Sequence, residues 1–157
     1  MAGTVCFTGH RQISDAEYTP LMEALRVEIE KQIRGGAMDF RTGGALGFDT
    51  MAALSVLSLR REYPDIRLHL ILPCPTQTQD WSPSDIRLYE QIMEQADSAR
   101  FVSSFYYNGV LQVRNRALVE GSDTCIAFLK NSHGGTAYTS ALAIKKGLEF
   151  VNLAEAL

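Results

Sequence analysis

The chain of 157 residues lacks any long hydrophobic segment. A membrane-spanning helix needs roughly 20 consecutive apolar residues, and no run in this sequence approaches that length. The first residues also lack the basic start and the apolar core of a signal peptide. We therefore expect a protein that does not insert into a membrane and that stays in the cytoplasm.

Basic residues are too few and too scattered to predict a nucleic-acid surface. The sequence has 15 Lys and Arg against 18 Asp and Glu, which is a net charge of −3. Proteins that bind nucleic acids usually concentrate basic residues in one patch. The composition therefore argues against a nucleic-acid partner, but it leaves room for a few arginines around a single phosphate group.

Cysteine and histidine are also scarce, and several well-known motifs are missing. Cys6, Cys74 and Cys125 have no short spacing between them, which predicts buried free thiols rather than disulfides or zinc ligands. The sequence contains no G-x-G-x-x-G fingerprint, no G-K-[ST] phosphate loop and no G-x-S-x-G elbow. These absences argue against an ordinary dehydrogenase and a P-loop NTPase, and we predict no metal site.

Short apolar segments alternate with longer segments of helical periodicity. We predict strands at residues 4–8, 38–41, 67–72, 98–102, 124–129 and 149–152. We predict helices at about residues 20–33, 48–60, 110–120 and 137–146, and one more that begins at residue 83. The alternation predicts a single domain over residues 1–157. Its expected fold is α/β and Rossmann-like, with a mostly parallel six-stranded sheet, helices on both faces and strand order 3-2-1-4-5-6.

Local signals predict where two of these helices begin. Thr19 is expected to cap the first helix, with Pro20 at its first position, and Ser82 with Pro83 is expected to begin the third helix in the same way. The helix at residues 48–60 is apolar on nearly every side. We expect it to pack on the sheet and also on something else, either a covering helix or the partner in a homodimer.

The loops that follow the strands are the candidate site, because such sheets bind ligands beyond the carboxyl ends of their strands. The loops T-G-G-A-L-G-F-D and H-G-G-T are glycine-rich and lead into helices, where backbone N–H groups and the helix dipole favour a phosphate. The same glycines would also suit tight turns without a ligand. The candidate ligand-binding residues are Gly9, His10, Arg11, Gly43, Gly44, Gly47, Asp49, Arg114, Asn115, Gly134, Gly135 and Thr136.

Several of these side chains have two expected roles. Arg11 suits a phosphate through its fork of donors, and it would otherwise be a surface residue. His10 would stack on a base or donate to an oxygen, or else be a turn residue that bonds to backbone. Asp49 would accept from ribose hydroxyls or serve as the one candidate catalytic group, and otherwise it caps a helix. Thr136 would contact a phosphate or act as an N-cap.

Two further choices concern the arginines of V-R-N-R and the aromatic residues of the loops. Arg114 and Arg116 lie on different faces of a helix, and we expect Arg114, with Asn115, to face the site. A second set of side chains would form the wall of a base pocket, or pack elsewhere in the molecule. These are Trp81, Tyr106 and Tyr107.

Five segments taken together resemble a known family. In chain order they are TGHR, TGGALGFDTMAA, LPCPTQTQDWSPSD, RNRALVEGSD and HGGTAYTSALA. They are similar to the YpsA-like family of the SLOG superfamily, which is named after the Smf/DprA and Lonely Guy proteins. The resemblance covers nearly the whole chain. It implies a Rossmann-like fold with a pocket for a nucleotide or nucleotide derivative, and it extends to the candidate ligand-binding residues.

The resemblance implies a class of ligand rather than a reaction. The Lonely Guy branch cleaves nucleoside monophosphates and carries a P-G-G-x-G-T-x-x-E motif, whereas this chain has S-H-G-G-T-A-Y-T-S-A without the glutamate. The DprA branch binds single-stranded DNA, for which this acidic chain offers no basic segment. We therefore expect binding or sensing of a small nucleotide-like molecule, such as an ADP-ribose or NAD derivative. The alternatives are a hydrolase for N-glycosidic or phosphate bonds, and a self-associating module with a vestigial pocket.

Overall fold

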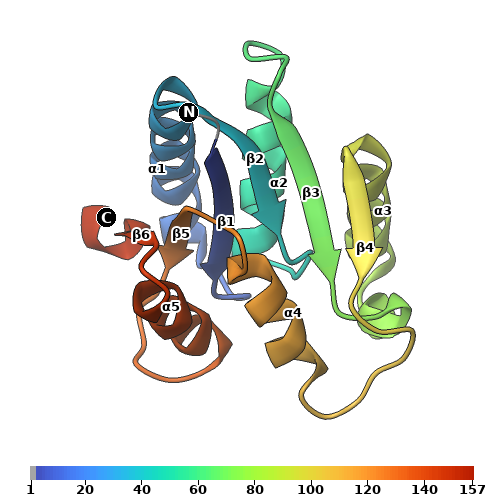
Figure 1. The fold of residues 1–157 in the computed structure, drawn as a ribbon. Helices are drawn as coiled ribbons and strands as arrows, with labels where there is room; N and C mark the ends of the chain where they lie inside the picture. The colour runs from blue at the N-terminus through green and yellow to red at the C-terminus, as the bar shows by residue number, and fades with distance from the viewer. Residues whose placement is uncertain (1–2) are drawn as a thin grey trace.

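The computed structural model describes residues 3–157, which form a six-stranded parallel sheet with helices on both faces (Figure 1). The strands are β1 (Gly3–Gly9), β2 (Ala37–Thr42), β3 (Arg67–Leu72), β4 (Ser98–Phe101), β5 (Thr124–Phe128) and β6 (Glu149–Asn152). The helices are α1 (Asp15–Arg34), α2 (Phe48–Leu59), α3 (Pro83–Gln95), α4 (Val110–Val119) and α5 (Gly135–Lys145), with short 3₁₀ helices at Pro75–Thr78 and Leu153–Ala156. The predicted Rossmann-like α/β fold is confirmed.

The strand order is β4-β3-β2-β1-β5-β6, so the predicted order 3-2-1-4-5-6 is wrong. It is β5, not β4, that pairs with β1, and β4 lies at the edge of the sheet beside β3. Burial explains the difference, because all five residues of β5 are buried whereas all four residues of β4 are exposed. The strand order still changes direction at β1, because β2, β3 and β4 follow one another on one side of it and β5 and β6 on the other.

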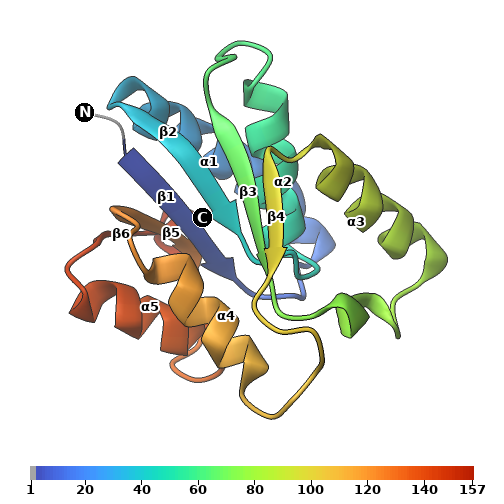
Figure 2. The ribbon, with the colours of Figure 1, turned by 45° about the vertical axis from the view of Figure 1, so that its right-hand side comes forward.

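This order sends the helices to two different faces of the sheet. Helices α1, α2 and α3 cover one face, and α4 and α5 cover part of the other (Figures 1 and 2). Helix α2 lies between the sheet, α1 and α3, and residues on most of its turns are buried. Its apolar sides are therefore met by covering helices of the same chain, which is one of the two arrangements that the sequence predicts.

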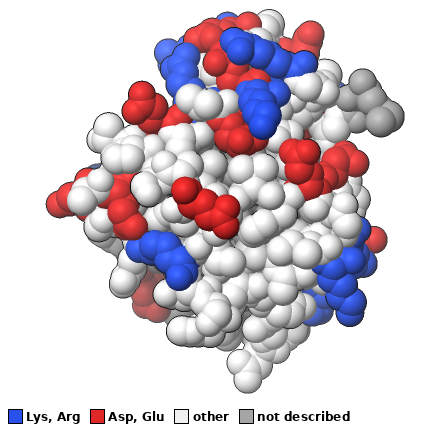
Figure 3. Space-filling view, turned by 90° about the vertical axis from the view of Figure 1, so that its left-hand side faces the viewer, with Lys and Arg blue, Asp and Glu red and all other residues white. Residues whose placement is uncertain are grey.

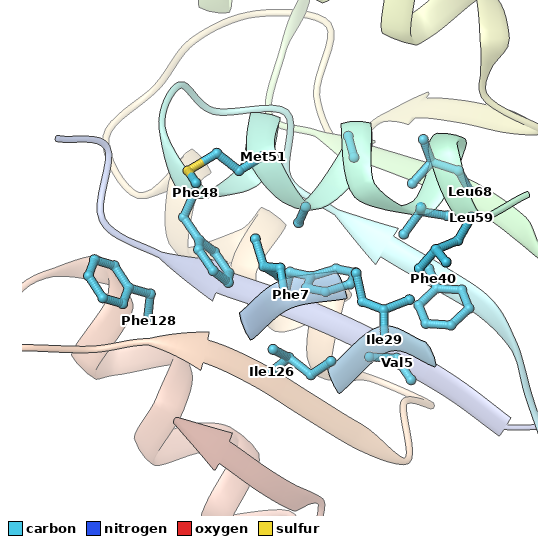
Figure 4. Packing of buried hydrophobic residues seen from close by; sticks show 14 of the residues in the cluster. Val5, Phe7, Ile29, Phe40, Phe48, Met51, Leu59, Leu68, Ile126 and Phe128 are labelled. Carbon is cyan, nitrogen blue, oxygen red and sulfur yellow. The ribbon is translucent and has the colours of Figure 1, made fainter. Parts of the chain in front are cut away.

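The main hydrophobic core lies between the sheet and the layer of α1 and α2 (Figure 4). Four fully buried phenylalanines, Phe7, Phe40, Phe48 and Phe128, join β1, β2, β5 and the start of α2. The rings of Phe48 and Phe128 stack with their centroids 6.1 Å apart. This aromatic core lies directly beneath the carboxyl ends of β1 and β5, so it holds the loops that follow these strands. The three cysteines are buried free thiols, as predicted.

The start of α1 differs from the prediction, and the start of α3 agrees with it. Helix α1 begins at Asp15, where Ser14 and Glu17 form a capping box and the Ser14 hydroxyl accepts the Glu17 N–H at 3.2 Å. Pro20 therefore lies inside the helix, and Thr19 is not its cap. For α3 the predicted cap is confirmed, because the Ser82 hydroxyl accepts the Asp85 N–H at 3.2 Å.

Candidate functional site

A cavity of about 420 Å³ lies at the carboxyl end of β1. Its lining comes from β1 and the loop after it, from the start of α2, from one side of α4 and from the N-terminus of α5. These segments meet at the reversal of strand order, which is where sheets of this kind bind ligands. Eight candidate residues from the sequence line the cavity: Gly9, His10, Arg11, Asp49, Arg114, Asn115, Gly135 and Thr136.

Two glycines allow the loop after β1 to lie directly against the start of α2. A Cβ atom on Gly9 would lie 2.3 Å from the ring of Phe48, and one on Gly47 would lie 2.2 Å from the Arg11 carbonyl oxygen. Gly47 also has a φ of +77°, which other residues adopt only with strain. The Phe48 N–H then donates to the His10 carbonyl at 3.1 Å. The two loops are thus fixed to each other, with Arg11 at their junction.

The His10 ring holds a third loop in place. Its Nε2 accepts the backbone N–H of Lys130 at 2.9 Å, which requires a neutral ring with its proton on Nδ1. The ring also packs edge-on against Phe128, with centroids 5.8 Å apart. Burial, followed by the charge of Lys130, lowers the pKa of His10 and keeps the ring neutral. Of the two predicted roles, the observed contacts match the one in which His10 bonds to backbone.

Asp49 and Arg114 bring two buried charged groups to the wall of the cavity. Asp49 is 7% exposed and Arg114 is 5% exposed. They close around Gly43, because a Cβ atom on this glycine would lie 2.8 Å from Nη1 of Arg114 and 3.0 Å from Oδ2 of Asp49. Nη1 of Arg114 donates to the Gly43 carbonyl, and its Nε donates to Oδ1 of Asn115 at 2.8 Å. Asp49 accepts the N–H of Ala45 at 3.2 Å.

The burial of this pair determines its electrostatics. Burial raises the pKa of the Asp49 carboxyl, although the positive charges of Arg114 and Arg11 and the N–H groups of the loop act in the opposite direction. Burial likewise lowers the pKa of Arg114, a group that stays charged in proteins. Asp49 is therefore a carboxyl that holds a proton more tightly than usual, which suits a hydrogen-bond donor or a general acid.

The N-terminus of α5 offers backbone donors to the cavity. Its N-cap is Gly134 with a φ of +98°, and no described side chain caps the first turn. Gly135 and Thr136, which begin the helix, line the cavity. The first N–H groups of a helix lack partners within it, and the helix dipole favours an anion there. Thr136 lies in the first turn, so the alternative role of N-cap that the sequence suggested for it is wrong.

Other candidate residues lie outside the cavity lining. Gly43, Gly44, Gly47 and Gly134 shape the surrounding loops without lining it. The side chains of Tyr106 and Tyr107 are 63% and 38% exposed in the loop after β4, and neither lines the cavity. That loop starts from the edge strand, because β4 does not lie beside β1 as expected.

Trp81 belongs to a neighbouring groove rather than to the cavity itself. It packs edge-on against Tyr89, with ring centroids 5.4 Å apart, in a groove of about 390 Å³. Leu88 of α3 and Arg11 also line this groove. Arg11 therefore lines both the cavity and this groove, which meet at its side chain.

Sequence reasoning missed several residues that line the cavity. Leu111 and Gln112 lie one turn before Asn115 on α4 and face the same way. The helical spacing of three and four residues from Asn115 was the signal that could have identified them. Arg116 lies on another side of α4, where it donates to the Tyr138 hydroxyl at 3.2 Å, as expected for a residue facing away from the site.

Among residues 3–157, none of the helices has the length and the apolar character needed to span a membrane.

Comparison with curated proteins finds relatives in several bacilli. A UPF0398 protein of Bacillus pumilus is 29% identical over 123 residues, which are 74% of this chain and 66% of that protein. A UPF0398 protein of Bacillus anthracis is 28% identical over 130 residues, with 81% of this chain and 71% of that protein covered. A UPF0398 protein of Brevibacillus brevis is 32% identical over 106 residues. The chain thus spans about two thirds of the first relative's length.

Two solved structures share the fold. DNA processing protein A from Streptococcus pneumoniae has a TM-score of 0.68 at 15% identity, covering 94% of this chain and 49% of that one. DNA processing protein A from Helicobacter pylori, described for its single-stranded DNA binding mode, has a TM-score of 0.65 at 19% identity. The match covers 94% of this chain and 63% of that one. The family model for YpsA, described as the YspA SLOG family, matches residues 5–150. The chain belongs to this SLOG family.

Proposed function

We propose that this SLOG protein binds or senses a nucleotide or nucleotide derivative in the cavity at the carboxyl end of β1. One observation carries the proposal: an uncapped helix N-terminus, a buried Asp49–Arg114 pair and Arg11 all border a single cavity of about 420 Å³. Pockets for small molecules commonly measure about 300–1,000 Å³ and contain a few convergent polar groups.

A phosphate group of the ligand would lie at the start of α5. There the N–H groups of the first turn would donate to the phosphate oxygens, and the dipole of the helix would add to the attraction. Arg11 supplies a positive charge at the rim, and it has no ion-pair partner within residues 3–157. A guanidinium group can hold two phosphate oxygens at once.

The remaining parts of the ligand would meet polar and apolar groups of the same cavity. Asn115 and Gln112 offer hydrogen bonds suited to ribose hydroxyls, and Phe7 and Leu111 offer apolar walls. A ligand with two ends, such as ADP-ribose or NAD, would extend past Arg11 into the groove lined by Trp81. In this arrangement Trp81 is the base-pocket wall that the sequence suggested.

Binding can be tested directly by calorimetric titration and thermal shift with AMP, ADP, ADP-ribose and NAD. A ligand at 100 times its dissociation constant should raise the free energy of unfolding by about 2.7 kcal/mol. Arg116→Ala is the matched control, because Arg116 is an exposed arginine of α4 outside the cavity. If none of the four nucleotides binds to the wild-type protein, the proposal is wrong.

A second candidate function is hydrolysis of a nucleotide, and Asp49 is the observation that favours it. Its carboxyl lines the cavity, and burial raises its pKa, as is found in general acids. Chromatography of nucleotides incubated with the protein would detect cleavage of an N-glycosidic or phosphate bond. Turnover that survives Asp49→Asn would remove Asp49 from this role.

The likeness to DNA processing protein A suggests a nucleic acid as an alternative partner. On the face shown in Figure 3, lysines and arginines form separate groups with acidic residues between them. That face therefore offers no continuous basic patch, and the net charge of −3 also favours a small ligand over an extended phosphate backbone. A single-stranded oligonucleotide that binds more tightly than any of the four nucleotides would reverse this preference.

A further inference from the structure

Three side chains on adjacent strands form a hydrogen-bonded chain away from the cavity. Nδ1 of His69 on β3 lies 2.6 Å from the Ser98 hydroxyl on β4. Nε2 of the same ring lies 2.7 Å from Oδ1 of Asp39 on β2. His69 is paired with Ser98 in the β3–β4 register, so the strand pairing itself sets this alignment. We propose that Ser98, His69 and Asp39 form a nucleophilic site that takes acyl groups from small anionic esters.

Hydrogen bonding determines which ring nitrogen of His69 can act as a base. Asp39 has only acceptor oxygens when ionised, so Nε2 of His69 must carry the proton that it donates to Asp39. The lone pair on Nδ1 then faces the Ser98 hydroxyl, which is the arrangement that activates a serine.

Asp39 is itself held in place as a carboxylate. Arg67 donates to Oδ1 and Oδ2 of Asp39 from Nε and Nη2, at 2.8 and 3.2 Å. Such two-point pairing fixes the plane of the carboxylate as well as its charge. Asp39 does not reach the reacting atom, so it is a positioning residue for His69.

The three residues lie in an accessible hollow of about 310 Å³ on the face of the sheet that carries α4. Within the described chain, α4 and α5 leave the N-terminal halves of β2, β3 and β4 open on this face (Figures 1 and 2). An exposed face is unusual for parallel strands, which are generally covered on both sides. This hollow shares no lining residue with the nucleotide cavity, so the two proposals are independent.

Arginines determine the class of substrate. Arg100 follows Ser98 by two residues on the same strand and lines the same hollow, as does Arg41. Arg41 donates to carbonyl and hydroxyl groups near the end of α4, whereas Arg100 is exposed and has no ion pair among residues 3–157. Arg100 would therefore attract an ester that carries a carboxylate, or stabilise the oxyanion formed during attack.

The reaction transfers an acyl group to the serine. The Ser98 oxygen attacks the ester carbonyl carbon and forms a C–O bond, while its proton moves to Nδ1 of His69. Collapse of the tetrahedral intermediate breaks the bond to the leaving alcohol, which takes that proton from His69. Water then attacks the acyl-serine, His69 accepts its proton and returns it to Ser98, and the free acid leaves.

The probe is the mono-4-nitrophenyl ester of terephthalic acid, whose carboxylate cannot reach its own ester carbonyl; it is mixed with the full chain and followed by release of 4-nitrophenolate. We expect a burst approaching one equivalent per chain, with the terephthaloyl group mapped to Ser98 by peptide mass spectrometry. The burst should be lost in Ser98→Ala and reduced at least tenfold in rate in His69→Gln. Ser104→Ala is the matched control, because Ser104 is an exposed serine in the loop beyond β4.

Either of two results would overturn the proposal: no acylation of the wild-type chain, or a burst that Ser98→Ala retains. Ser98 is exposed at the edge of the sheet, so its alanine variant tests the site even if His69→Gln fails to fold. The role of Asp39 has its own readout in nitrogen NMR of the His69 ring. The wild type should show the proton on Nε2, and Asp39→Asn should lose this preference while remaining folded. An unchanged tautomer would mean that Asp39 does not position His69.

Discussion

Two aspartates of this protein, Asp49 beside the cavity and Asp39 on the open sheet face, respond to their surroundings in opposite ways. Burial raises the pKa of Asp49, whereas hydrogen bonds from Arg67, and then from His69, lower the pKa of Asp39. Asp49 is 7% exposed, and the Asp39 side chain is 25% exposed. Both have an arginine nearby, so the presence of a positive charge does not account for the difference.

The number and directness of the hydrogen bonds separate the two sites. Asp39 accepts from Arg67 twice and from His69 once while part of its surface stays in water. Asp49 accepts a hydrogen bond from the Ala45 N–H at 3.2 Å. The neighbouring Arg114 donates to Gly43 and Asn115 instead of to the Asp49 carboxyl. A buried carboxyl whose nearest cation bonds elsewhere keeps most of its desolvation penalty. The cavity therefore contains a carboxyl whose burial is unfavourable, and such perturbed groups are common in binding sites.

The largest expected effect comes from breaking the buried site at Arg114. Arg114→Ala leaves the Gly43 carbonyl without its donor, removes the positive charge beside Asp49 and opens a cavity, and together these losses should cost about 3–5 kcal/mol. Denaturant unfolding measures this loss. Arg116→Ala, at an exposed arginine of the same helix, should change stability by less than about 0.5 kcal/mol. Equal effects of the two variants would mean that the pair is not buried as described.

A second prediction tests the rigid junction of the loops at the cavity. Gly47→Ala combines a positive φ with a Cβ position 2.2 Å from the Arg11 carbonyl, so we expect a loss of about 2–4 kcal/mol in the free energy of unfolding. Gly147→Ala has a similar φ of +82° but no atom within 4 Å of its Cβ, so only backbone strain of about 1 kcal/mol should remain. Losses of the same size would show that the loops do not press on each other.

The two aspartates should also give opposite pH trends. Asp49 binds its proton more tightly when folded, so its contribution to stability is present below the unfolded pKa of about 3.9 and is lost as pH rises toward the folded pKa. Asp39 binds its proton less tightly when folded, so its contribution is present above about 3.9 and is lost as pH falls through the folded pKa.

Asparagine variants remove each contribution, and groups that do not contact the mutated carboxyl titrate alike in variant and wild type. Between about pH 7 and about pH 4, the stability of wild type relative to Asp49→Asn should rise as the pH falls. The stability of wild type relative to Asp39→Asn should instead fall as the pH drops below about 4, by less than about 1 kcal/mol because Asp39 is partly exposed. Chemical unfolding at a series of pH values measures both, and two trends of the same sign would refute the contrast.

The fold was largely predictable because its signals are local. The strands at Arg67–Leu72 and Glu149–Asn152 match the predicted ranges, and Ser82 caps α3 as expected. The position of β4 was missed because strand order depends on which strand is buried, and the polar S-A-R-F against the apolar T-C-I-A-F was the overlooked signal. The start of α1 was missed although the sequence S-D-A-E at residues 14–17 has the spacing of a capping box.

The two sites differ in how far the sequence could lead to them. Glycine clusters after β2 and before α5 point to the cavity, and Arg114 was chosen over Arg116 from helical spacing alone. Nothing in the sequence links Asp39, His69 and Ser98, because they are spread over three strands. Only the register of the folded sheet brings them into contact. Burial of Asp49 was equally hidden, since a helix-starting aspartate is usually an exposed cap.

Titration of ADP-ribose into the wild type and into Arg11→Ala is the most direct test of the central claim, that the cavity binds a nucleotide-like ligand. Arg11 is exposed and borders the cavity, so its removal should weaken binding at least tenfold and change the unfolding free energy by less than about 0.5 kcal/mol. Arg116→Ala should bind like the wild type. Unchanged affinity in Arg11→Ala, or a large loss of stability with binding intact, would contradict the account.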